Sequence, residues 1–177
     1  MVTHLVLAVI GRDRPGLVSA VSEVVTAGGG NWLDTRMASL AGQFAGILLV
    51  SVPVGKADAL IASLKTLEVQ GLKLIIEKAG DPEVLAAPLP GRTMALELIG
   101  LDRPGIVRDL SRVLSAQGVS ISELETERVA GSFSGEPMFK ARARLQLPDG
   151  LGDETLRRSI ESLANELMVD LNLDRGD

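Results

Sequence analysis

The chain has no cysteine and no tyrosine, and its 177 residues include one tryptophan, three phenylalanines and one histidine. Without cysteine, disulfides, thiol nucleophiles and thiolate metal sites are excluded. His4 has no second histidine or carboxylate cluster at metal-binding spacing. Gly55-Lys56 is not a P-loop, and Gly131–Gly135 misses the G-x-S-x-G nucleophile turn by one position. We therefore predict no catalytic residue, metal or cofactor, and a protein that is not an enzyme.

Positive charge is in the minority, with a formal net charge of −5. Nucleic-acid binders normally carry a basic surface, so direct contact with DNA or RNA is disfavoured. The longest apolar stretches fall short of the ~20 residues that span a bilayer. Met1–Leu5 lacks the basic segment of a secretory signal. We expect a soluble cytoplasmic protein without membrane contact.

What the sequence does contain is an internal repeat. The stretch Gly11-Arg12-Asp13-Arg14-Pro15-Gly16-Leu17-Val18 returns 89 residues later as Gly100-Leu101-Asp102-Arg103-Pro104-Gly105-Ile106-Val107, with six of eight positions identical. Each copy follows an apolar strand-like run and precedes a helix-like one, so the chain is predicted to be one unit written twice. We expect a first domain over 1–79, a linker rich in proline and glycine over 80–91, and a second domain over 92–177.

Hydrophobic periodicity predicts the order βαββαβ in each copy. A strand (Val2–Ile10 or Thr93–Ile99) precedes an amphipathic helix that ends at Gly28 or Gly118. A hairpin, a second helix and a last strand follow. In the first copy the hairpin strands are expected near Trp32–Ser39 and up to Pro53, and the last strand near Leu72–Glu77. In the second copy the hairpin strands are expected near Ile121–Val129 and up to Pro148, and the last strand near Leu167–Leu173. The predicted class is α+β, with two ferredoxin-like units that each place two helices on one face of an antiparallel sheet.

The repeated turn has a structural interpretation that needs no ligand. Proline fits the first turn of a helix, where its missing N–H breaks no bond, and this predicts such a place for Pro15 and Pro104. Aspartate is favoured at a helix N-cap, which predicts capping by Asp13 and Asp102.

The open faces of the two sheets are expected to differ. In the second copy, alternating acidic and basic residues on two adjacent strands predict three cross-strand pairs, each contributing about 0.2–1 kcal/mol: Glu127 with Lys140, Glu125 with Arg142, and Glu123 with Arg144. Such a face is either an anion or RNA platform or, as we favour, a self-neutralised solvated surface. In the first copy the corresponding face is apolar, at Val6, Ala8, Ala45, Ile47 and Leu49. Such a face is typical of an interface, and we predict that the other unit, a protein partner or a second copy in a homodimer covers it.

The βαββαβ order and the G-x-D-R-P-G turn resemble ACT domains, the small-molecule sensing modules of amino-acid metabolism. The tandem pair resembles the glycine cleavage system transcriptional repressor group over nearly the whole chain. Leu124–Arg128, Gly135–Phe139 and the strand end at Pro148 are similar to that group's second domain. The resemblance implies that amino acids bind beside the loop between first strand and first helix, often where two ACT units meet.

This resemblance points to two candidate ligand loops. A helix N-terminus offers N–H groups and a positive dipole to a carboxylate, glycine allows close approach, and aspartate can meet an ammonium group. The candidate ligand-binding residues are Asp13, Arg14, Pro15, Gly16, Leu17 and Asn31, and in the second copy Asp102, Arg103, Pro104, Gly105, Ile106 and Ser120. Because Ser120 replaces the asparagine common in ACT ligand sites, we favour the first loop.

Two functions stay open at this point. One is a non-enzymatic regulator that senses a small amino acid, glycine being one candidate, and controls glycine cleavage or related metabolism through a protein partner such as a DNA-binding activator. The alternative is a regulatory subunit or scaffold of an amino-acid or folate enzyme. An RNA-binding module shares the βαββαβ order, but here the central strands offer no outward aromatic for base stacking.

Overall fold

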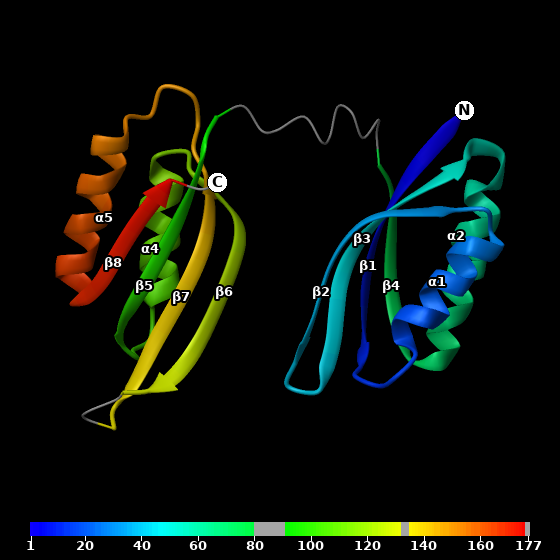
Figure 1. Ribbon diagram of the computed structural model, residues 1–177, viewed down its shortest axis with the longest axis horizontal. Coiled ribbons are helices and arrows are strands. Elements are labelled where there is room, and N and C mark those ends of the chain that lie inside the picture. The colour runs from blue at the N-terminus through cyan, green and yellow to red at the C-terminus, as the bar shows by residue number, and fades with distance from the viewer. Residues whose placement is uncertain (80–90, 132–134, 176–177) are drawn as a thin grey trace. The chain divides into compact units, whose positions relative to one another are not determined.

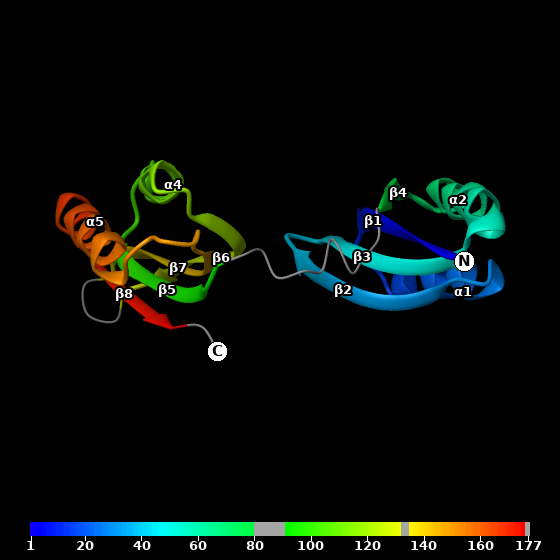
Figure 2. The same cartoon turned by 90° about the horizontal axis from the view of Figure 1, so that it is seen from above.

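The computed structural model describes residues 1–79, 91–131 and 135–175. The chain divides into two compact units, Met1–Ala87 and Pro88–Asp177. In each unit two helices cover one face of a four-stranded antiparallel sheet, as Figures 1 and 2 show. This confirms the predicted α+β class. Of the predicted linker over 80–91, only residue 91 lies within the described part of the chain.

The first unit has the sheet order β2-β3-β1-β4. Its elements are β1 (Val2–Arg12), α1 (Leu17–Ala27), β2 (Asn31–Leu40), β3 (Gln43–Pro53), the 3-10 turn η1 (Val54–Lys56), α2 (Ala57–Lys65), the 3-10 turn η2 (Thr66–Gln70) and β4 (Leu72–Ala79). Alternate residues of β1, namely Leu5, Leu7 and Val9, are buried beneath the helices. They pack against the apolar residues of α1. Side chains repeat every two residues along a strand and every 3.6 residues along a helix, so each element turns its apolar side chains toward the other.

The second unit repeats this arrangement, in the order β6-β7-β5-β8. Its elements are β5 (Thr93–Leu101), α4 (Ile106–Ala116), β6 (Ser120–Ala130), β7 (Pro137–Gln146), α5 (Asp153–Leu167) and β8 (Val169–Arg175). Its core is a separate cluster built around Leu96, Leu98, Leu110 and Leu145. β7 ends at Gln146, so the strand end predicted at Pro148 is wrong. The N–H of the intervening Leu147 donates instead to the carbonyl oxygen of Arg92, at 2.9 Å.

The first helix of each unit begins after a glycine. Gly16 and Gly105 are the N-caps, with φ of 90° and 97°, and no side chain caps either helix. These left-handed conformations are ones that glycine adopts without steric cost, and they turn the chain into the helix. The helix therefore starts later than predicted. The prediction that Pro15 and Pro104 lie in the first helical turn is therefore wrong, and so is the prediction that Asp13 and Asp102 cap the helices.

The open face of the second sheet carries the predicted charges. The register sets Glu127 opposite Lys140, Glu125 opposite Arg142 and Glu123 opposite Arg144, which confirms the predicted pairing of the strands. The first and third of these pairs form ion pairs, at 3.8 and 3.6 Å. Arg142 departs from the prediction, because its Nε bonds Glu97 Oε1 on β5 at 3.2 Å. A side chain on β7 has neighbours on both sides, and Arg142 takes the one on β5.

Candidate functional site

Two hydrogen bonds hold the loop between β1 and α1 to neighbouring segments. The N–H of Asp13 donates to the carbonyl oxygen of Gly42 in the β2–β3 turn, at 3.0 Å. Arg14 Nη2 donates to the carbonyl oxygen of Gln70, at the end of η2, at 2.7 Å. Gly16 lies exposed between these ties, and a Cβ added to it would meet no atom within 4 Å. The loop is therefore a fixed turn with open space at its glycine.

The arginine of the repeat makes an equivalent contact in both units. Arg103 Nη2 lies 3.5 Å from the carbonyl oxygen of Glu166, near the end of α5. A cation at the carbonyl end of a helical segment complements its dipole and its unpaired acceptors. In both units this arginine therefore joins the loop to the segment before the last strand, which gives the repeat a structural reason.

The second loop differs from the first in the partner of its aspartate. Arg128 Nε on β6 lies 2.8 Å from Asp102 Oδ2. The residue equivalent to Arg128 in the first unit is Ser39. Each of the two pairs with a phenylalanine, which in turn pairs with the first glycine of the repeat. Within the described residues Asp13 forms no ion pair. The first loop thus presents an exposed carboxylate where the second has a neutralised one.

The glycine of the second loop also has a charged side chain beside it. A Cβ on Gly105 would lie 3.1 Å from Arg108 Nη2 and 3.6 Å from Asp109 Oδ2. Arg108 Nε bonds Asp109 Oδ1 at 2.8 Å, and this hydrogen bond lowers the pKa of Asp109 below its ordinary value. The equivalent residues in the first unit are Ser19 and Ala20, too short to reach over the glycine. The first-turn amides of α1, which no side chain caps, therefore stay open to an acceptor.

Asn31 and Ser120 lie far from these loops. Asn31 opens β2 and pairs with Ser51, which pairs with His4 near the start of β1. The candidate ligand loop follows Arg12, at the other end of that strand. At about 3.3 Å per residue, the separation along β1 is roughly 25 Å. Ser120 occupies the corresponding end of the second sheet. As Figure 1 shows, β2 and β6 begin at the end of the sheet opposite to each loop, so the structure does not bring these two residues to the others of their unit.

Among the hollows that the described residues line, two of more than 400 Å³ were not predicted from the sequence. One, of about 590 Å³, lies on the open face of the first sheet between Ile10, Ile47 and Ile75, with Arg36 and Lys73 at its edges. The alternating apolar residues of β1 and β3 are the signal for this face, and β4 adds Ile75. Ile47 is 54% exposed and Ile75 is 65% exposed within this single chain.

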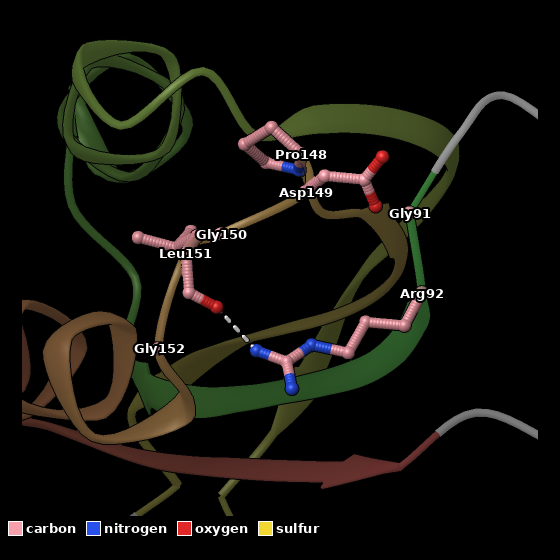
Figure 3. A pocket seen from close by; sticks show the side chains of 7 residues that line it. All are labelled: Gly91, Arg92, Pro148, Asp149, Gly150, Leu151 and Gly152. Atoms are coloured by element: carbon pink, nitrogen blue, oxygen red, sulfur yellow. Dashed lines mark hydrogen bonds between the residues drawn. The ribbon is translucent and has the colours of Figure 1, made fainter.

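The other hollow, of about 410 Å³, lies in the second unit between Gly91 and the turn before α5. Figure 3 shows Arg92 reaching across it toward Leu151, with Asp149 on the opposite side. Arg92 Nη2 bonds the carbonyl oxygen of Leu151 and lies 2.6 Å from Asp153 Oδ1. These contacts hold the start of α5 to the residue that precedes β5, which is a structural role. The sequence of Pro148–Gly152 is typical of a turn and does not predict a hollow.

Two kinds of site are missing from the described residues. Over 1–79, 91–131 and 135–175, no group of three or more metal-ligating side chains comes together. Within the same ranges, no helix combines the length and apolar character needed to cross a membrane.

Comparison with known proteins gives one family and several relatives. Residues 3–76 match the ACT domain family. The chain is 29% identical over 166 residues to the glycine cleavage system transcriptional repressor of Escherichia coli (strain K12), covering 93% of this chain and 85% of that protein. It is 34% identical over 79 residues to a UPF0237 protein of Methanocaldococcus jannaschii, covering 45% of this chain and 77% of that protein. The crystal structure of an unknown protein from Galdieria sulphuraria, 28% identical, covers all of both chains with a TM-score of 0.87.

Proposed function

Because the chain belongs to the ACT domain family, we propose that it is a non-enzymatic regulator that senses a small amino acid at the β1–α1 loop of its first unit. The observation that carries this proposal is the difference between the two loops. The first has an exposed Asp13 and an uncovered Gly16, whereas in the second Arg128 pairs with Asp102 and Arg108 reaches over Gly105.

The first loop offers complementary groups to both ends of an amino acid. The ligand carboxylate would accept from the open amides of the first turn of α1, which begins at Leu17, where the helix dipole favours negative charge. The ammonium group would meet the carboxylate of Asp13. Arg14 would act indirectly, by holding the loop against Gln70. Asn31 lies at the far end of the sheet, and we propose the site without it.

We propose that the signal passes through protein contacts and concerns glycine cleavage. The support is the likeness to the Escherichia coli repressor, which extends over 93% of this chain. Glycine is accordingly the first ligand to test. A net charge of −5 opposes direct binding to DNA, so the partner would be a protein such as a DNA-binding activator. We also propose that the chain forms a homodimer through the apolar sheet face of its first unit.

The test is isothermal calorimetry of the full chain against each of the twenty amino acids, glycine first. We expect one small amino acid to bind, and Asp13→Asn to weaken it at least about tenfold, because a close charge pair is lost. The matched control is Asp102→Asn, which should leave the affinity unchanged. Binding of no amino acid, or equal effects of both variants, would contradict the proposal.

A further inference from the structure

The open face of the first sheet carries an ordered set of charges around its apolar centre. Three rows of side chains cross this face from β2 to β4, as the strand pairing defines. They are Asp34–Leu49–Val6–Glu77, Arg36–Ile47–Ala8–Ile75 and Ala38–Ala45–Ile10–Lys73. The charged residues all lie on the two edge strands, and the two inner strands contribute only apolar residues to these rows.

On this face each edge strand carries one acid and one base, placed symmetrically. On β4, Lys73 and Glu77 lie two residues either side of Ile75. On β2, Asp34 and Arg36 lie either side of Thr35, and their side chains form an ion pair of 2.7 Å. A two-fold axis exchanges the residues on either side of it. An axis through the levels of Thr35 and Ile75 would therefore set Lys73 beside Glu77 of a second copy and Asp34 beside Arg36 of that copy.

The slope of this axis fits the way sheets pack. Thr35 is level with Leu48, Leu7 and Ile76, so the axis shifts by one residue between β2 and β4. One residue is about 3.4 Å and three strand spacings are about 14 Å, which tilts the axis about 13° from the perpendicular to the strands. The strands of two copies would then cross about 26° from antiparallel. Sheets that pack face to face keep their strands within about 30° of one another.

The second unit provides an internal comparison, because the same positions there oppose self-association. The positions of Lys73, Ile75 and Glu77 are occupied by Asp170, Asn172 and Asp174. The strand equivalent to β2 presents three acids, Glu123, Glu125 and Glu127, toward the same face. The acids of β6 face basic residues of β7, but at the β8 edge a two-fold contact of this face would set Asp170 beside Asp174 of a second copy, which costs free energy.

We infer that two copies of the chain join through their first units, open face to open face, about this axis. The inference rests on the proposed homodimer and specifies its geometry. The contact buries the apolar centre, including Ile47 and Ile75, which are 54% and 65% exposed in the single chain. Lys73 and Arg36 each meet an acid of the second copy at the rim. The occupant is a second copy because the charges on both edges complement themselves.

The test is a charge exchange, read by sedimentation equilibrium of the full chain. Lys73→Glu and Glu77→Lys should each weaken dimerisation at least about tenfold, because each creates two like-charge contacts per dimer. The double variant Lys73→Glu/Glu77→Lys should return to within about threefold of the unmodified chain, because both contacts are attractive again. The matched controls Asp170→Lys and Asp174→Lys, at the same positions of the second unit, should leave the equilibrium unchanged.

A third variant separates this face from pairing through the exposed edge of β4. Ile47→Asp places a charge in the centre of the face, on β3, and should give a monomer. A monomeric unmodified chain, a dimer that survives Ile47→Asp, or single reversals that the double variant does not rescue would each overturn the inference. Calorimetry with amino acids on the unmodified chain tests the sensing function independently. A monomer that binds an amino acid would reject only the dimer. A dimer that binds no amino acid would reject only the sensing function.

Discussion

Arg128 on β6 holds Asp102 in an ion pair of 2.8 Å, and this contact distinguishes the aspartates of the two candidate ligand loops. At the position of Arg128 the first unit has Ser39, whose short side chain leaves Asp13 exposed. The Asp-Arg-Pro-Gly stretch is therefore identical in both units, whereas the partner of its aspartate differs. The residue that makes this difference lies on the neighbouring strand, at Arg128 in the second unit and Ser39 in the first.

Ser39→Arg should convert the first loop into the state of the second. The new guanidinium would lie beside Asp13 and compete with the ligand's ammonium group, so amino-acid affinity should fall at least about tenfold. Calorimetry of the full chain measures this, and Ser39→Gln is the neutral control of similar reach. An unchanged affinity in Ser39→Arg would show that Asp13 does not contact the ligand.

Arg14→Ala should destabilise the first unit by about 1 kcal/mol, because it removes a charge-assisted hydrogen bond to the carbonyl oxygen of Gln70 at the protein surface. Trp32 is the only tryptophan and packs against the core of that unit, so its fluorescence in a urea titration reports this change. Arg103→Ala is the matched control in the second unit and should leave the Trp32 midpoint in place. Equal shifts in both variants would mean that the units do not unfold separately.

Asp109 should titrate at a lower pH than an ordinary aspartate. The hydrogen bond from Arg108 lowers its pKa in the folded chain, and the charges of Arg108, Arg112 and Arg103 act in the same direction. Because the folded pKa lies below the unfolded one, the stabilisation is present above the unfolded pKa and is lost as pH falls through the folded pKa.

Carboxyl NMR titration of Asp109 checks this. In Arg108→Gln the midpoint should rise toward the ordinary value, and in Arg112→Gln it should rise less, because Arg112 contributes only through its charge. A midpoint that does not move in Arg108→Gln would contradict the hydrogen bond as the cause.

The order of elements could be predicted because periods of 2 and 3.6 are visible in the sequence. The start of α1 could not be placed from spacing, because it depends on the left-handed conformation of Gly16. The alternation of charges on two strands could not identify the partner of Arg142, since Glu97 comes from a third strand. The separation of Asn31 from the loop does follow from topology: a helix after β1 returns the chain to the strand's starting end.

Leu7→Ala and Leu96→Ala form a matched pair, because these residues lie 89 positions apart and both are 0% exposed, in two separate cores. Each truncation should cost about 2–5 kcal/mol, from lost burial and the cavity that remains. Leu7→Ala should lower the urea midpoint reported by Trp32 fluorescence, whereas Leu96→Ala should leave it in place and lower a second transition seen only by circular dichroism. If Leu96→Ala shifts the Trp32 midpoint as far as Leu7→Ala does, the two units unfold as one cooperative body, and their cores stabilise each other.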